Sequence, residues 1–353
     1  MHFNSICYYY FSSSLDQMKK SFKKLLLLLN CILLFLGGTG GPLVMRLYFL
    51  KGGNGVWISS AMETAGFPFM LLSLFISYLH RRKKDNSGSQ TKLFYITTRI
   101  FLASAVLGLL TGLDDFLYTY GVARLPITTS GLIYASQLGF TAGFAFLLVK
   151  QKFTSYSINA VFLLSLGSVI LAFHSSSDRP NNESNREYFM GFIMTVVASA
   201  LYGFVLPAIE LVYKKANQNI TYTLVMEMQM VMSFFATGML LHSDFTGMER
   251  EANEFELGKS KYATIIFSLA VLWQCFFMGA IGVIFCGSTL LSGIAMAALL
   301  PVMEILAVFI YDETFRVEKG LSLVLSIWGF ISYFYGEYKQ SKINNQASEL
   351  DIP

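Results

Sequence analysis

The sequence predicts an all-α integral membrane protein whose ten transmembrane helices form two inverted five-helix repeats. Three observations lead to this fold class: the composition, the spacing of the apolar segments and the distribution of the basic residues. Hydrophobic residues make up 54% of the 353 residues and charged residues only 14%, against roughly 25% charged residues in ordinary soluble domains. This composition excludes a water-soluble fold, and the length fits ten spans of about 20 residues in a single membrane unit.

The apolar segments are separated by short polar stretches, and each is close to the length that crosses about 30 Å of hydrocarbon. We expect a loose N-terminal extension over 1–18, one ten-helix domain over 19–340 and a C-terminal tail over 341–353. The ten expected spans are 25–50, 56–79, 98–122, 126–149, 155–174, 189–212, 221–242, 263–285, 289–311 and 320–337.

Lys and Arg residues are distributed unequally between the two sets of alternating loops. One set holds fifteen of them, including the runs at 19–24 and 81–92, and the other set holds nine. Because cytosolic loops carry the excess of basic residues, the richer set is expected in the cytosol. Both termini then lie in the cytosol, as an even number of spans requires. We expect the plasma membrane as the location.

The two halves of the chain show a weak internal similarity. A shift of about 162 residues lays 135–167 over 297–329, so the repeats are expected at about 25–174 and 189–337. The hairpin that reads Lys150-Gln151-Lys152 in the first copy reads Asp312-Glu313-Thr314 in the second. Five-helix copies face opposite ways, so a basic cytosolic hairpin should correspond to an acidic external one. Inverted repeats of this kind are typical of secondary transporters.

Several long strings in the chain carry a resemblance to a known family. They are GGPLVMRLYFLKGGNGVW (40–57), GLLTGLDDFLYTYGVARLPITTSGLIYASQLGFTAGFAFLLVKQKFT (108–154), ELVYKKA (210–216), LVMEMQMVM (224–232) and LPVMEILAVFIYDETFRVEKGLSLVLSIWGFISYFYGEY (300–338). From about 25 to 340 the chain closely resembles the plant purine permeases of the drug/metabolite transporter superfamily. The resemblance implies ten helices and proton-coupled transport of purine bases such as adenine and of derivatives such as cytokinins.

Acidic residues inside the expected spans are the first candidates for a site, because a charge at the centre of a bilayer costs at least about 2.5 to 3.5 kcal/mol. Glu63 lies shortly before Pro68, which should kink its helix. We interpret it as a proton or substrate site, with pairing to Arg46 as the alternative. Asp114 shares a helix face with Tyr118, and both are expected in the site. Asp115 points elsewhere and is expected to be structural or to lie at a helix mouth.

The seventh and ninth spans add further polar candidates. Glu227 and Gln229 lie among methionines of the seventh span, and Glu227 has no basic neighbour in its own helix. Glu304 follows Pro301 in the ninth span, in a segment that resembles a discontinuous helix lining a cavity. Glu210, by contrast, lies four residues before Lys214, which favours an ordinary interfacial ion pair.

The fourth span and the aromatic residues complete the expected site. Gln137 offers both a donor and an acceptor, which matches the mixed edge of adenine. Tyr134 lies three residues before it, and planar bases gain on the order of 1 to 3 kcal/mol from each aromatic side chain on which they stack. Trp273 is a further aromatic candidate, whereas Trp57 at a span end is expected in the interfacial belt.

Other functional classes leave little trace in the sequence. The net charge of +4 does not suggest nucleic-acid binding, and the four histidines lack metal-ligand spacing, so neither a metal nor another cofactor is expected. A membrane-embedded transferase would need clustered acids or histidines at a membrane face. A carrier of nucleotide sugars would need several buried basic residues. A carrier of another heterocycle or an alkaloid stays open, the oligomeric state is not defined, and the protein is not expected to be an enzyme.

Overall fold

The computed structural model describes residues 2–84, 93–125, 136–173, 185–241, 245–311 and 317–350, and these ranges contain helices and no strand. Tyr134 and the hairpin 312–314 lie outside the described residues. The helices are α1 (His2–Leu50), α2 (Val56–Thr64), α3 (Phe67–Lys84), α4 (Thr98–Val122), α6 (Gln137–Val149), α7 (Ser155–Phe173), α8 (Asn185–Lys215), α9 (Tyr222–Leu240), α10 (Phe245–Glu254), α11 (Lys259–Cys286), α12 (Thr289–Tyr311) and α13 (Val317–Leu350).

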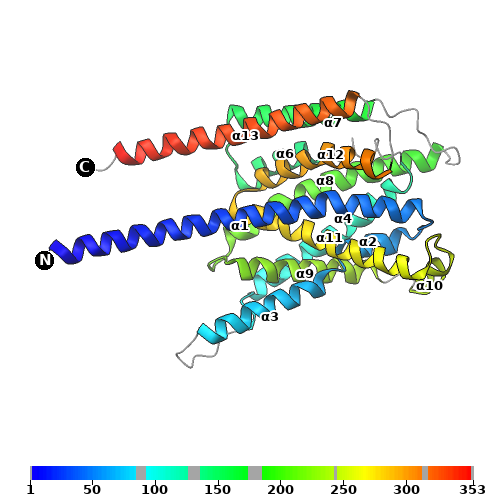
Figure 1. Ribbon diagram of the computed structural model, residues 1–353, viewed down its shortest axis with the longest axis horizontal. Helices are drawn as coiled ribbons and strands as arrows, with labels where there is room; N and C mark the ends of the chain where they lie inside the picture. Colours follow the sequence, from blue (N-terminus) through cyan, green and yellow to red (C-terminus); the bar gives the residue numbers. More distant parts are fainter. Residues whose placement is uncertain are drawn as a thin grey trace.

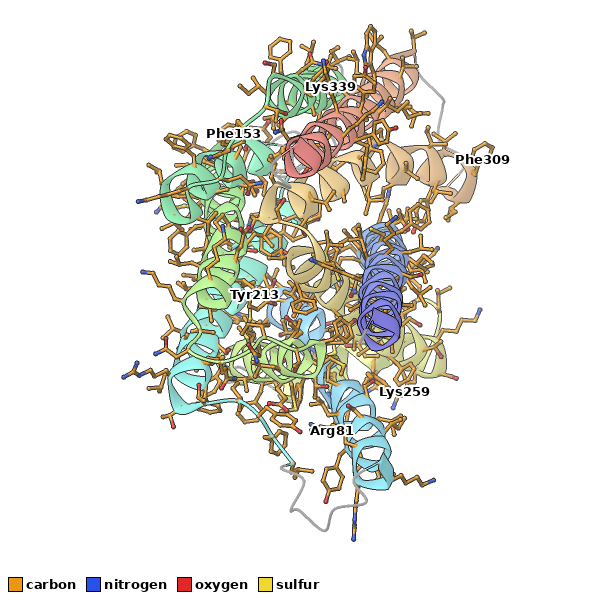
Figure 2. All side chains as sticks on the ribbon, turned by 90° about the vertical axis from the view of Figure 1, so that its left-hand side faces the viewer. Arg81, Phe153, Tyr213, Lys259, Phe309 and Lys339 are labelled. Atoms are coloured by element: carbon orange, nitrogen blue, oxygen red, sulfur yellow. The ribbon has the colours of Figure 1, made fainter. Side chains whose placement is uncertain are left out.

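Most of these helices are long and apolar enough to cross a membrane. Within the described residues seven spans meet that condition, and α6 and the first part of α7 are shorter apolar helices. The surface of the bundle is lined with large apolar side chains such as Phe309, which is 78% exposed and projects outward from α12 (Figure 2). Buried positions, in turn, include many polar and acidic side chains. An apolar surface around an interior in which polar and acidic residues lie among the buried apolar side chains is typical of a helical bundle in lipid, so the expected helical integral membrane protein is confirmed.

The long helices run along a common direction, and the N- and C-terminal ends of the described chain lie at the same end of the bundle (Figure 1). Glycines allow the closest helix contacts. A Cβ atom on Gly37 would lie 2.6 Å from the Cα of Phe276, so α1 packs directly on the backbone of α11. Gly108 and Gly112 bring α4 equally close to α9. In a bilayer, association of helices depends on such close packing, and small residues four positions apart permit it.

Four details differ from or refine the expected spans. The α1 helix begins at His2 and α13 continues to Leu350, so helix extends into both expected terminal segments. The second span is interrupted between α2 and α3, directly before Pro68, where a kink was expected. The α12 helix, in contrast, runs through Pro301 without a break, so the expected discontinuous helix is not observed there.

Candidate functional site

Three acidic side chains meet in the interior between α2 and α4. Glu63, Asp114 and Asp115 are 1%, 4% and 2% exposed. Glu63 accepts a hydrogen bond of 2.7 Å at Oε1 from the hydroxyl of Thr119. Glu63 lies seven residues after the start of α2, which is about 10 Å along the helix. Asp114 lies eight residues before the end of α4, which is about 12 Å along that helix. We refer to Glu63, Asp114 and Asp115 as the acid cluster.

The members of the acid cluster act on one another electrostatically. The charged group that acts on Glu63 is Asp114, and those that act on Asp115 are Glu63 and Asp114. Because all three are carboxyl groups, their mutual effect is repulsive when they are ionised. Among the described residues no group of three His, Cys, Asp or Glu side chains has the geometry to hold a metal ion.

Aromatic rings from three helices surround the acid cluster. Tyr118 on α4 and Tyr202 on α8 both lie within electrostatic range of Glu63 and Asp114. The ring of Tyr118 meets the indole of Trp273 on α11 edge to face, at 6.5 Å between centroids and 73° between planes. Tyr202 stacks on Phe276 of α11 at 6.3 Å and 23°. Two tyrosines therefore lie near the acids and are backed by rings of α11, which provides planar apolar surfaces of the kind that a planar molecule could contact.

Several buried polar atoms in this region have no hydrogen-bond partner in the described part of the chain. They are Asp114 Oδ1, Asp115 Oδ2, Trp273 Nε1 and both amide atoms of Gln274. Leaving a buried polar group without a partner costs about 1 to 3 kcal/mol, and native proteins contain few such groups. Such atoms also occur on other helices of the described chain, but here they lie beside buried acids and aromatic rings, where water or a bound molecule could supply the missing hydrogen bonds.

The structure brings only part of the expected site together. Glu63, Asp114 and Tyr118 belong to one region, and Trp273 lies beside Tyr118. Gln229 is buried in α9, where its Nε2 donates to Ser233 at 2.9 Å and its Oε1 has no partner.

Gln137 and Glu304 lie on the neighbouring helices α6 and α12. Gln137 is buried at the start of α6, with its Nε2 3.9 Å from the sulfur of Met296 on α12. Glu304 lies on α12 three residues after Pro301, and its side chain is outside the described part of the structure.

Glu227 lies away from the acid cluster, at the end of the bundle where α4 begins. Its carboxylate accepts hydrogen bonds from the backbone N–H groups of Tyr95 and Ile96, each at 2.8 Å to Oε2. Asp114 lies sixteen residues after Thr98, which is about 24 Å along α4. Glu227 thus fixes the segment that leads into α4, far from the other acids.

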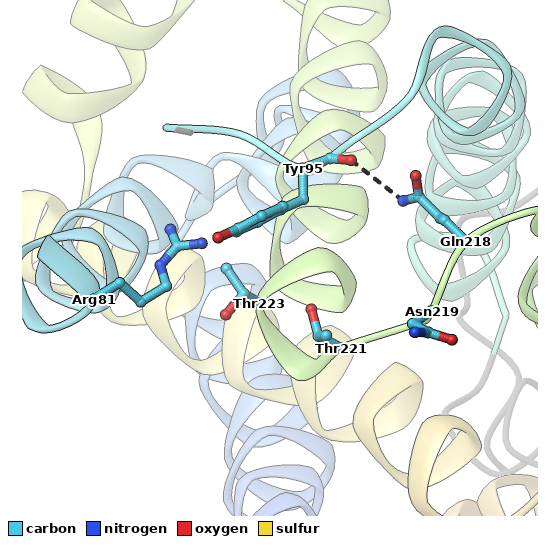
Figure 3. Close-up of a pocket in the computed structure, with 6 residues that line it drawn as sticks. All are labelled: Arg81, Tyr95, Gln218, Asn219, Thr221 and Thr223. Carbon is cyan, nitrogen blue, oxygen red and sulfur yellow. Dashed lines mark hydrogen bonds between the residues drawn. The ribbon is translucent and has the colours of Figure 1, made fainter. Parts of the chain in front are cut away.

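An open pocket of about 340 Å³ lies at this same end (Figure 3). Its lining comes from the end of α3, from the segments before α4 and α9 and from the first turn of α9. The guanidinium of Arg81 lies 4.5 Å from the ring centroid of Tyr95, and Gln218 donates to the carbonyl of Tyr95 at 3.2 Å. The pocket is separate from the acid cluster and opens where α3 ends.

Four residues in or near the acid cluster were not predicted from the sequence as site residues. Asp115 was expected to be structural or to lie at a helix mouth, yet it is as buried as Asp114. Thr119, Tyr202 and Gln274 were not expected at all. For Gln274 the sequence does carry a signal: it is an amide in the middle of the long apolar helix α11, directly after Trp273. Trp57, in agreement with a belt position, is exposed and stacks on Phe116 at 4.1 Å between centroids.

Comparison with known proteins identifies the family. Residues 25–343 match the family model described as purine nucleobase transmembrane transport. The chain is 48% identical over 318 residues to purine permease 3 of Arabidopsis thaliana, covering 89% of this chain and 91% of that protein. It is also 48% identical over 338 residues to purine permease 2 of the same plant, covering 91% and 94%. Purine permease 21 is 36% identical over 310 residues, covering 86% and 78%.

A solved crystal structure shares the fold. It superposes with a TM-score of 0.59 over 89% of this chain and 96% of the other, at 13% sequence identity. That likeness concerns the fold alone, whereas the family model and the relatives cover nearly the whole chain. The family and these relatives are permeases, not enzymes. The chain therefore belongs to the purine permease family.

Proposed function

We propose that this protein is a proton-coupled transporter that moves purine bases such as adenine, and purine derivatives such as cytokinins, across the plasma membrane. Family membership and the names of the relatives support a purine-type substrate. The observation that carries the proposal is the buried region in which the acid cluster, the aromatic rings and unsatisfied polar atoms come together.

The chemistry of this region suits a purine and a proton. Carboxylates and an amide provide hydrogen-bond partners for the N–H groups and ring nitrogens of a base, and Tyr118, Tyr202 and Trp273 provide apolar planar surfaces. Three carboxylates in a water-poor interior repel one another, and binding of a proton relieves that repulsion. One acid of the cluster would then carry the coupled proton while the others hold the substrate. The other expected site residues remain candidates for contact with the substrate on its way through the bundle. They are Gln137, Gln229, Glu304 and, by its sequence position, Tyr134.

The expected architecture is part of the same proposal. Ten crossings in two inverted five-helix repeats, about 25–174 and 189–337, would form one transporter domain over 19–340. The positions of the two ends of the chain at one end of the bundle agree with an even number of crossings (Figure 1). The excess of Lys and Arg in the loops at that end supports a cytosolic location of both termini. Alternating access would arise from rocking of the two halves about the buried region.

Substitution of Asp114 by Asn tests the site. Asp114→Asn keeps the size of the side chain but removes the charge and the proton-binding oxygen. Uptake of labelled adenine by yeast cells expressing the variant should fall at least about tenfold per molecule at the membrane, the loss expected from one charge-assisted hydrogen bond. A protonophore should abolish uptake by the unsubstituted protein.

The matched control is Glu254→Gln on α10, whose side chain is 69% exposed and forms only a surface pair with Arg250. It should leave uptake unchanged. Full uptake by Asp114→Asn would remove Asp114 from the site, and full uptake in the presence of the protonophore would exclude proton coupling.

A further inference from the structure

Gln274 carries two polar groups that the fold buries and leaves unsatisfied. The residue is 4% exposed, and neither its Nε2 nor its Oε1 has a hydrogen-bond partner within the described residues. Gln274 lies in the middle of α11, away from the helix ends, where an amide side chain could pair with free backbone groups. Both groups of Gln274 have therefore given up their hydrogen bonds to bulk water and are available to a bound molecule that can pair with them.

The position of Gln274 relates it to the acid cluster. A Cβ atom on Gly66 would lie 2.6 Å from the Cβ of Gln274, so α11 touches the chain where α2 gives way to α3. Glu63 lies three residues before Gly66, about one helical turn away. On the other side of Gln274, the adjacent Trp273 meets Tyr118, which lies one turn after Asp114. Gln274 is thereby held next to the helices that carry the acids and the rings.

The side chains of the region differ in which features of a bound base they can distinguish. An ionised carboxylate only accepts hydrogen bonds, and an aromatic ring contacts the face of a base without regard to its edge. An amide offers one acceptor and one donor at a fixed spacing. Gln side chains use this pair to read the N6 amino group and the neighbouring ring nitrogen of adenine.

We propose that Gln274 sets the specificity of the site by reading the edge of the bound heterocycle. Its Oε1 accepts a hydrogen bond from an exocyclic amino group, and its Nε2 donates to the ring nitrogen beside that group. The acid cluster and the aromatic rings bind planar nitrogen heterocycles in general, and Gln274 selects those with an amino group next to an acceptor nitrogen. This inference rests on the proposed function of the same site.

Competition by two bases tests the proposal. Adenine has the amino group, and unsubstituted purine lacks it but keeps the ring system. The unsubstituted protein should prefer adenine to purine by at least about tenfold as a competitor of labelled adenine uptake, which is within the discrimination of one bidentate amide contact. In Gln274→Met, which has a similar volume but no polar groups at these positions, the preference should shrink to less than about threefold, through weaker binding of adenine.

The control is Gln151→Met in the segment between α6 and α7. Gln151 also has a buried amide oxygen without a partner, but it lies outside the acid and aromatic region. It should keep the preference for adenine. A second variant, Gln274→Leu, guards against an effect peculiar to methionine, and labelled purine uptake reports whether each variant is folded and active.

Retention of the adenine preference in either Gln274 variant overturns the proposal. Equal loss of adenine and purine uptake also overturns it, because that pattern shows a structural role. Failure of the proposed function has a different signature: the unsubstituted protein itself would show no saturable uptake of either base, which overturns both statements.

Discussion

At the scale of single residues, the buried acids fall into two kinds. Glu227 has both oxygens engaged by backbone N–H groups of the segment before α4, so its charge is used to hold the chain. In the acid cluster, Glu63 accepts a hydrogen bond from one hydroxyl, while Asp114 and Asp115 each keep a buried oxygen that finds no partner among the residues the structure describes. Satisfied groups stabilise a fold, and unsatisfied groups indicate binding. By this difference, rather than by burial alone, we assign Glu227 a structural role and propose the acid cluster as the binding site.

The two kinds of acid predict opposite results for substitution. Glu227→Ala leaves the N–H groups of Tyr95 and Ile96 without their acceptor and should lower the free energy of unfolding by about 1 to 3 kcal/mol. Thermal unfolding of the purified protein in detergent measures this. Glu249→Ala, at an exposed position of α10, should change stability by less than about 0.5 kcal/mol. Wild-type stability of Glu227→Ala together with loss of uptake would instead place Glu227 in the transport site.

At the scale of helices, the end of α8 joins two other elements. Glu210 accepts a hydrogen bond of 2.7 Å from the first backbone N–H of α12, at Thr289, and pairs with Lys214 at 2.8 Å, as the sequence predicted. Lys214 also donates to the carbonyl of Val149, the last residue of α6, at 3.2 Å. A carboxylate at a helix N-terminus and an ammonium at a helix C-terminus both agree with the helix dipoles. One pair of side chains thus fixes the ends of α6 and α12 on α8.

This arrangement predicts unequal effects for the two members of the pair. Glu210→Ala removes the acceptor of a buried N–H and should destabilise the protein by about 1 to 3 kcal/mol. Lys214→Ala removes a side chain that is 52% exposed and should cost less than about 1 kcal/mol. Glu254→Ala, from the exposed pair on α10, is the matched control and should have little effect. Equal melting temperatures for Glu210→Ala and this control would contradict the role assigned to Glu210.

The helices themselves were largely predictable, whereas the site was predictable only in part. Apolar segments of span length and the proline after Glu63 appear directly in the sequence, because the bilayer imposes both length and composition. Which polar residues meet depends on how the helices pack, and this is not contained in any one helix. Asp114 and Tyr118 were found because they share one face of α4. Gln274 and Tyr202 were missed because only the packing of α11 against α2 and of α8 against α4 brings them near the acids.

At the scale of the whole molecule, the buried region and the Glu210 pair lie at different depths. Tyr202 faces the acid cluster, and Glu210 lies eight residues further along α8, which is about 12 Å closer to the end that holds both termini. The contacts that fix the ends of α6 and α12 on α8 therefore lie nearer to that end than the acid cluster does.

We propose that substrate binds between the acid cluster and the aromatic rings, and a structure of the protein determined with adenine bound would show whether it does. We expect the base within hydrogen-bond distance of Gln274 and of at least one of Glu63, Asp114 and Asp115, with its plane against Tyr118, Tyr202 or Trp273. Adenine bound in the pocket beside Arg81 and Tyr95, with the acid cluster unoccupied at saturating concentration, would contradict it.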